Sequence, residues 1–155
     1  MEYIERTREE GCILCQKPGE NCDEANYILC RGESNFVILN AFPYNPGHLM
    51  VAPYRHTANL QDLTEEEAKE HFDVIRKCIM LLTRALKPAG FNVGLNIGRV
   101  AGAGIEDHIH THIVPRWQGD ANFMPIAANT KVISEALATT YRKLKSAIDQ
   151  ISTPP

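Results

Sequence analysis

Along the middle of the chain, hydrophobic and polar positions alternate with the period of an α-helix. The apolar side chains return every three or four positions, and they are Ala68, Phe72, Ile75, Ile79, Leu82 and Leu86. This spacing lines them up on one side of a helix, so an amphipathic helix is predicted over Thr64–Lys87. Thr64 and Glu67 form a capping-box sequence at its start, and Pro88 and Gly90 end it.

Shorter hydrophobic runs on both sides of this helix have the length of β-strands. The predicted strands are Tyr27–Arg31, Phe36–Asn40, His48–Pro53, Phe91–Ile97 and His108–Val114. Turn-forming residues separate the first three strands, and Pro115 closes the last one. A second helix is predicted around Ile133 to Ile148, and one side of it carries Ile133, Leu137, Tyr141, Leu144 and Ile148. Strands joined by short turns, together with two helices, predict an α+β fold with an antiparallel β-sheet.

Composition and charge narrow the class of protein. The 155 residues fit a single domain over 1–155, and 44% of them are hydrophobic. The formal net charge of −3 argues against a nucleic-acid partner, which requires an excess of Lys and Arg. No run approaches the roughly 20 apolar residues of a membrane span, and the segment Met1–Arg6 is too charged for a signal peptide. We therefore expect a cytoplasmic protein that does not act at a membrane, and any nucleotide it binds to be small and held in a pocket.

Three histidines alternate with other residues at the end of the chain's central part. Because side chains in a strand alternate between faces, His108, His110 and His112 are expected to share one face, with Thr111 on the other. An exposed polar face and a metal site made by all three histidines are alternatives. Catalysis is favoured, since an imidazole is both a nucleophile and a proton carrier near neutral pH.

The run His108–Val114 resembles the signature of the histidine triad (HIT) family, in which three histidines are separated by single, usually hydrophobic residues. The stretch Pro46–Val51 resembles the segment that precedes the long helix in that family, and the similarity extends from about Cys12 to Trp117. One departure is Thr111, where a hydrophobic residue is usual. The resemblance implies a HIT-like fold and a homodimer with the long helix as the contact.

The resemblance also implies a covalent mechanism. His110 attacks the α-phosphorus of a nucleotide and forms a nucleotidyl-imidazole intermediate. For the Nε2 atom of His110 to be available, its Nδ1 proton should be held by an acceptor such as a backbone carbonyl. His112 is placed to donate to a phosphate oxygen or to the leaving oxygen, and is the candidate acid.

Polar and glycine residues near the triad are candidates for holding the nucleotide. The predicted nucleotide-binding residues are Asn40, Asn96, Arg99, Gly102, Gly104 and Arg116. By resemblance Asn40 binds the ribose hydroxyls; the alternative is a turn residue that ends its strand. The peptide N–H groups of the loop Gly98–Gly104 could cradle phosphate oxygens. A flexible surface loop without a ligand is an equally favoured interpretation of this segment. Arg99 and Arg116 could hold a second anion between two guanidiniums.

Cys12 and Cys15 have the spacing at which two thiolates bind one Zn²⁺ ion. The resemblance supplies His56 and His108 as the other ligands, which would make a closed structural site. Two buried thiols without metal are the alternative, and Cys22 or Cys30 could substitute as ligands. A redox pair is disfavoured because the surrounding polar segment has no βαβ pattern.

The segment Pro115–Phe123 resembles the diadenosine tetraphosphate phosphorylase branch of the family, and the loop before the triad lacks the Gln of the animal hydrolases. The sequence therefore favours phosphorolysis of diadenosine tetraphosphate to ATP and ADP, with nucleotides (AMP, ADP, ATP and diadenosine polyphosphates) and phosphate as the ligands. One alternative is a hydrolase of dinucleoside polyphosphates or nucleoside phosphoramidates. Another is a nucleotide-binding adaptor whose slow turnover is incidental.

Overall fold

The computed structural model describes residues 11–120 and 134–152, and these build one five-stranded sheet. Its strands are β1 (Ile28–Arg31), β2 (Asn35–Leu39), β3 (Leu49–Pro53), β4 (Gly90–Leu95) and β5 (Thr111–Arg116). Every neighbouring pair is antiparallel, and the order across the sheet is β1-β2-β3-β5-β4. The predicted α+β fold with an antiparallel sheet is confirmed.

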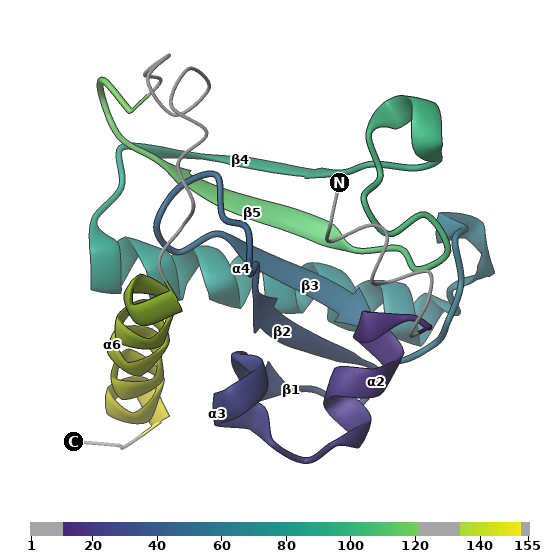
Figure 1. Cartoon of the computed structure of the whole chain (residues 1–155), viewed down its shortest axis with the longest axis horizontal. Helices are drawn as coiled ribbons and strands as arrows, with labels where there is room; N and C mark the ends of the chain where they lie inside the picture. The colour runs from purple at the N-terminus through teal and green to yellow at the C-terminus, as the bar shows by residue number, and fades with distance from the viewer. Residues whose placement is uncertain (1–10, 121–133, 153–155) are drawn as a thin grey trace.

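Helices cover both faces of this sheet (Figure 1). The described helices are α2 (Ile13–Gly19), α3 (Asp23–Asn26), α4 (Glu65–Leu86), α6 (Ser134–Ser152) and the short 3-10 helices η1 (Leu60–Asp62) and η2 (Arg99–Ala101). Helix α4 packs on β2, β3 and β5, and α6 packs against α4 and β1. None of the helices within the described residues is both long and apolar enough to cross a membrane.

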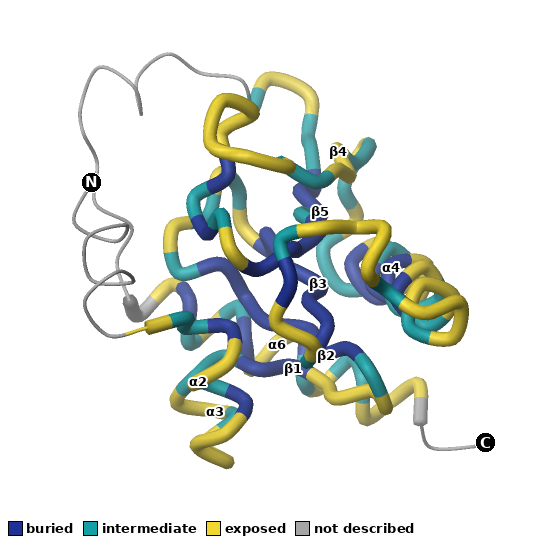
Figure 2. Tube along the Cα trace, turned by 90° about the vertical axis from the view of Figure 1, so that its right-hand side faces the viewer, coloured by how far each residue is buried: buried dark blue, intermediate teal, exposed yellow. Residues whose placement is uncertain are grey.

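The core lies on both sides of β1–β3, whose residues are almost all buried (Figure 2). Towards α4 and α6 the buried residues include Leu29, Val37, Leu39, Leu49, Val51, Ile75, Leu82, Ile113 and Leu144. On the opposite face they are Leu14, Ile28, Phe36, Ile38, Met50, Ala52 and Ile105. Burial on two faces explains why these strands are continuous hydrophobic runs. Burial of each Val, Leu, Ile, Phe or Met side chain among them stabilises the fold by about 1.5–3 kcal/mol.

Helix α4 is confirmed, but its buried face differs from the predicted stripe. The capping box is present, because the Thr64 side chain accepts from Glu67 N and the Glu67 carboxylate accepts from Thr64 N at 2.9 Å. The buried positions are His71, Ile75, Cys78, Leu81 and Leu82. Phe72, which the stripe included, is 65% exposed. Hydrophobicity alone selected Phe72, whereas the helix turns a polar residue, His71, towards the sheet.

Three boundaries also require correction. Strand β4 ends at Leu95 instead of Ile97, and β5 begins at Thr111 instead of His108. Pro115 does not close β5 but lies within it. The pairing of β5 with β3 ends at Ile113, so at Pro115 the strand is paired only with β4. The polar segment 13–26 forms α2 and α3, which sequence patterns did not predict. Ile133 and residues 121–123, which carried part of the sequence argument, lie outside the described residues.

Candidate functional site

The imidazoles of His110 and His112 form a pair at the start of β5. His112 lies in the centre of the sheet, opposite Met50 of β3 and Gly94 of β4. The ring centroids of the pair are 4.8 Å apart with an interplanar angle of 74°. His110 is buried and His112 is half-buried. The two rings are therefore in direct contact, with the edge of one towards the face of the other.

A backbone carbonyl determines the tautomer of His110. Its Nδ1 atom lies 2.8 Å from the backbone oxygen of His108, so Nδ1 carries the proton and donates it. The lone pair of the neutral ring is then on Nε2. Burial lowers the pKa of His110, and the bond to His108 opposes this shift only in part. The carbonyl acceptor that the sequence argument required is present.

His48, which sequence reasoning did not assign a role, determines the tautomer of His112. The backbone N–H of Tyr44 donates to His48 Nδ1 at 3.1 Å, so the proton of neutral His48 is on Nε2. That Nε2 lies 2.9 Å from His112 Nδ1 and donates to it. His112 is thereby left with its proton on Nε2. Neighbouring rings of His110 and His112 thus offer a lone pair and a proton respectively.

The environment keeps these imidazoles neutral. Burial, followed by the charges of His112 and His110, lowers the pKa of His48 to about 3. Burial and His110 lower the pKa of His112 to about 4. Neutral rings suit a site that must hold both a nucleophile and a hydrogen-bond donor at pH 7.

Gly47 explains how His48 reaches this position. Its φ of 80° lies in the left-handed region, and it turns the chain into β3 directly before His48. A Cβ at Gly47 would lie 2.5 Å from a methyl carbon of Leu86. Only glycine therefore fits between the turn and helix α4. The sequence signal was limited to position, since His48 follows a Pro-Gly turn and directly precedes the buried strand β3, whereas its contact with His112 is not visible in the sequence.

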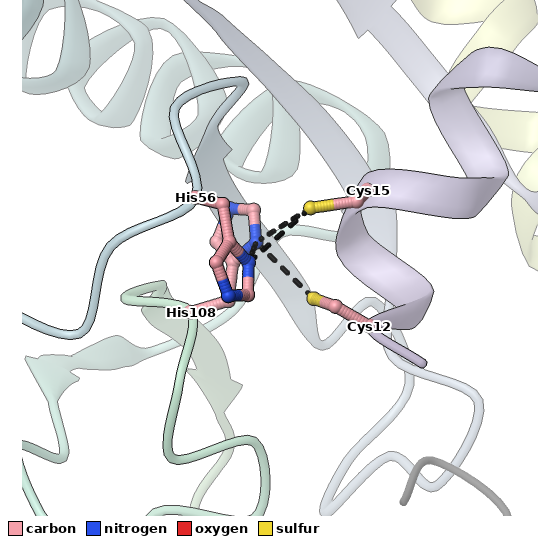
Figure 3. Close-up of side chains that lie close together, drawn as sticks. All are labelled: Cys12, Cys15, His56 and His108. Atoms are coloured by element: carbon pink, nitrogen blue, oxygen red, sulfur yellow. Dashed lines mark hydrogen bonds between the residues drawn. The ribbon is translucent and has the colours of Figure 1, made fainter. Parts of the chain in front are cut away.

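His108 joins a second cluster (Figure 3), together with Cys12, Cys15 and His56. One ligand atom from each residue lies within 4.8 Å of all the others. The His56 and His108 Nδ1 atoms are 3.3 Å apart, and each sulfur is 3.2–3.4 Å from a histidine Nδ1. Tetrahedral zinc would set about 3.3 Å between nitrogens and about 3.6 Å between sulfur and nitrogen. The four residues therefore fit a Zn²⁺ ion, and Cys22 and Cys30 lie outside this group.

Two further observations suit a cation in this cluster. His108 Nε2 donates to the Pro53 backbone oxygen at 2.8 Å, which leaves Nδ1 deprotonated and facing the sulfurs. Partial burial and the neighbouring Cys12 raise the pKa of the Cys15 thiol, since two thiolates repel one another. A metal ion would reverse that effect. The structure thus brings His108 together with the three other residues that the resemblance implied as metal ligands.

The predicted nucleotide-binding residues are more dispersed. Asn40 is buried, and its Oδ1 accepts from Phe42 N at 2.9 Å, as a turn residue would. Asn96 donates to the Gly102 backbone oxygen at 3.2 Å and holds the loop that follows β4. Gly98 and Gly102 both have positive φ, of 82° and 87°, and shape this loop. Gly104 follows them in the same loop and is half-buried.

The two arginines form separate ion pairs in the structure. Arg116 donates twice to the Asp120 carboxylate, both times at 2.8 Å, and once to Asn92 Oδ1 at 2.7 Å. It lies four residues beyond His112, which is about 13 Å along the strand. Arg99 is 72% exposed at its side chain and faces Glu106 at 3.5 Å. Asp120 and Asn92 thus engage the guanidinium of Arg116, and its role as an anion ligand stays a prediction.

Known proteins resemble both the sequence and the fold. The family model of the HIT domain matches residues 24–119. An AP-4-A phosphorylase from Mycobacterium tuberculosis is 47% identical over 122 residues, which is 79% of this chain and 63% of that protein. This chain thus spans less than two thirds of that relative.

Two solved structures share the fold closely. A histidine triad nucleotide-binding protein from Sulfolobus tokodaii superposes with a TM-score of 0.76 at 26% identity, covering 90% of this chain and 93% of its own. A Zn-bound histidine triad family protein from Mycobacterium smegmatis superposes with a TM-score of 0.74 at 25% identity, covering 92% of this chain and 96% of its own.

Proposed function

The chain belongs to the HIT domain family, and from that premise we propose that it is a nucleotidyltransferase that cleaves diadenosine tetraphosphate by phosphorolysis. The observation that carries the proposal is the pair of opposite tautomers, with a lone pair on His110 Nε2 beside a proton on His112 Nε2. A nucleophile and a hydrogen-bond donor are the two groups that displacement at phosphorus requires. The name of the 47% identical relative, AP-4-A phosphorylase, supports the choice of substrate.

The reaction would proceed by two displacements. His110 Nε2 attacks the α-phosphorus, a P–N bond forms, and the bond to the bridging oxygen breaks to release ATP. The N–H of His112 donates a hydrogen bond to that oxygen while negative charge develops on it. An oxygen of inorganic phosphate then attacks the same phosphorus and breaks the P–N bond. The products are ATP and ADP, and His110 is regenerated.

The acceptor decides between this proposal and its main alternative. Since Arg116 is engaged by Asp120, phosphate acceptance is supported by similarity to the phosphorylase more than by an identified anion site. Incubation with diadenosine tetraphosphate and ¹⁸O-labelled phosphate should give ATP and ADP that carries the label, identified by mass. Unlabelled AMP plus ATP, or two ADP, at a rate independent of phosphate would make it a hydrolase. Turnover too slow to sustain steady state would favour an adaptor.

We also propose that Cys12, Cys15, His56 and His108 bind one structural Zn²⁺ ion. Four protein ligands fill a tetrahedral shell, so the ion would have no open position for catalysis. It would tie α2 to the loop after β3 and to the residue that begins the triad. The Zn-bound relative from M. smegmatis supports the choice of metal.

Two broader expectations also remain proposals. A homodimer with α4 as a contact is supported by exposed apolar side chains on this helix, since Phe72 is 65% and Met80 is 56% exposed. A cytoplasmic location is supported by the five cysteines, which are all within the described residues and are all free thiols. Light scattering of the purified chain would test the first.

A further inference from the structure

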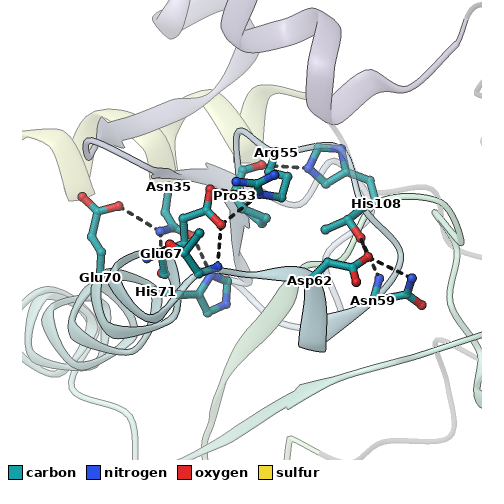
Figure 4. A network of polar contacts seen from close by, with 11 residues as sticks. Asn35, Pro53, Arg55, Asn59, Asp62, Glu67, Glu70, His71 and His108 are labelled. Atoms are coloured by element: carbon teal, nitrogen blue, oxygen red, sulfur yellow. Dashed lines mark hydrogen bonds and ion pairs between the residues drawn. The ribbon is translucent and has the colours of Figure 1, made fainter.

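Thr111 lies between the two catalytic candidates, and its side chain is held from the other face of the sheet. Its Oγ1 is 2.7 Å from His71 Nε2, and His71 Nδ1 is 2.6 Å from Asn35 Oδ1. All three side chains are buried. They come from β5, α4 and β2, so one polar chain crosses the layer between the helix and the sheet. Figure 4 shows His71 and Asn35 in this network.

Neighbouring groups fix the direction of each hydrogen bond. Asn35 Nδ2 donates to Glu70 Oε2 at 2.8 Å and to the Glu67 backbone oxygen at 3.2 Å, so its Oδ1 faces His71. His71 Nδ1 must therefore donate, and burial lowers its pKa and keeps the ring neutral. Its Nε2 is then an acceptor for the hydroxyl of Thr111. The Glu70 carboxylate is itself held by the backbone N–H groups of Glu33 and Ser34.

The Thr111 contact falls at the point where β5 begins. Thr111 is the first residue of the strand, and it is paired with Val51 of β3 and Leu95 of β4. His110 directly precedes Thr111, so its backbone lies at the edge of the ladder and has no paired residue before it. Strand ends are the places where ladder bonds open most readily. The hydrogen bond between His71 of α4 and Thr111 therefore restrains the backbone that carries His110 and His112.

We propose that His71 is a positioning residue for His110 and His112: its bond to Thr111 holds the start of β5, and with it the geometry of the two imidazoles. This inference rests on the proposed function for its effect on turnover. Because attack at phosphorus needs alignment of the nucleophile, a misplacement of about 1 Å can cost about 10²-fold in rate. Thr111 replaces the hydrophobic residue that is usual in the family, and its hydroxyl then serves as the hydrogen-bond partner of His71.

Two amide substitutions separate the two bonds of His71. In His71→Gln, Oε1 takes the place of Nε2 and accepts from Thr111, but the contact to Asn35 is lost. In His71→Asn, Nδ2 takes the place of Nδ1 and donates to Asn35, but the contact to Thr111 is lost. We expect both to lower Tm to a similar extent. Only His71→Asn should lower kcat, by about ten-fold, with KM for diadenosine tetraphosphate changed less than two-fold.

Ile75→Val is the matched control, since Ile75 is buried one turn further along the same face of α4. It should lower Tm and leave kcat unchanged. If kcat falls in all three variants in proportion to Tm, His71 has only a structural role and the proposal is overturned. Full kcat in His71→Asn would overturn it as well. Should His71→Asn fail to fold, Thr111→Val against Thr111→Ser compares loss and retention of the same hydroxyl, with the same expectations.

A second readout does not depend on the substrate. The ¹⁵N chemical shifts of the His110 and His112 imidazoles should change in His71→Asn and stay near their wild-type values in His71→Gln. Unchanged shifts in both variants would contradict the positioning role. If the wild-type protein does not turn over diadenosine tetraphosphate but the shifts behave as expected, the proposed function fails while the positioning role stands.

Discussion

His108 and His110 are two residues apart, yet opposite nitrogens of their rings are held by the backbone. In His108, Nε2 donates to the Pro53 carbonyl at 2.8 Å, and Nδ1 faces two cysteine sulfurs. In His110, Nδ1 donates to the His108 carbonyl at 2.8 Å, and Nε2 keeps the lone pair. The difference shows that the chemistry of an imidazole in such a run follows from the carbonyl it meets, and not from its place in the run.

The two clusters also contribute to stability in opposite ways. The four residues around His108 come from α2, from the loop after β3 and from the approach to β5, so a shared ion would join segments that are distant in sequence. The imidazoles of His48, His110 and His112 are instead buried as neutral rings, and protonation of any of them opposes folding. The first cluster should therefore lose stability when the metal is removed, and the second when the pH falls.

Of the changes considered, removal of the nucleophile His110 should have the largest effect, and that effect is on turnover. His110→Ala should lower turnover of diadenosine tetraphosphate by about 10³-fold or more, as loss of a covalent nucleophile does in other enzymes. Thermal stability and AMP affinity should stay close to those of the wild type, because the rest of the pocket is unchanged. Mass spectrometry of wild-type protein, quenched without acid, should detect a nucleotide on His110. Substantial residual turnover in the variant would exclude the covalent route.

Disruption of the metal cluster should act on stability first. The protein should contain about one zinc per chain, and Cys15→Ser should lose it and unfold at least about 5 °C earlier. Turnover should fall only as far as the folded fraction falls. Cys22→Ser is the matched control, since this exposed thiol lies outside the cluster and should change neither metal content nor Tm. Absence of zinc from protein prepared without chelators would refute the site.

Acid should act on the imidazole cluster over a defined pH window. His48 and His112 have folded pKa values of about 3 and about 4, below the ordinary 6.5, so the unfolded chain binds their protons first. Their contribution to stability is therefore complete above about pH 6.5 and is lost as pH falls to about 4 for His112 and about 3 for His48. Each group contributes a slope of up to about 1.4 kcal/mol for each pH unit. Urea unfolding at several pH values should give a shallower slope in His48→Gln, and an identical slope would contradict this account.

Structure that depends on residues close in sequence could be predicted, whereas contacts between residues distant in sequence could not. Thr64 and Glu67 signal the start of α4 because a capping box needs only residues close in sequence. The start of β5 depends on the partners Val51 and Leu95, which no local pattern of hydrophobicity reveals. His48 was missed for the same reason, since its role depends on a contact with His112, which is distant in the chain.

Arg116 shows a local signal that hydrophobic patterns overlook. Its partner Asp120 lies four residues later, after a turn in which Gly119 has a φ of 81°. Asp120 also accepts from Trp117 N at 2.9 Å and from Asn45, so the carboxylate organises the whole turn. An acidic residue behind a glycine turn was a reason to expect that the guanidinium would be engaged within the chain.

The smallest expected effect concerns Asn40, which lies beside the imidazole cluster and whose two amide atoms have separate tasks. Its Oδ1 accepts from Phe42 N, while Nδ2 lies 3.5 Å from His48 Nε2, which itself donates to His112 and so does not accept from Asn40. Nδ2 is therefore the atom that remains to donate to a ribose hydroxyl. Asn40→Ala should weaken AMP binding several-fold, since one such bond contributes about 0.5–1.5 kcal/mol, and should leave 2′,3′-dideoxy-AMP binding unchanged. Calorimetric titration with both ligands measures this difference. Equal loss for the two nucleotides would mean that Asn40 acts through the turn, because the turn bond does not sense the ribose.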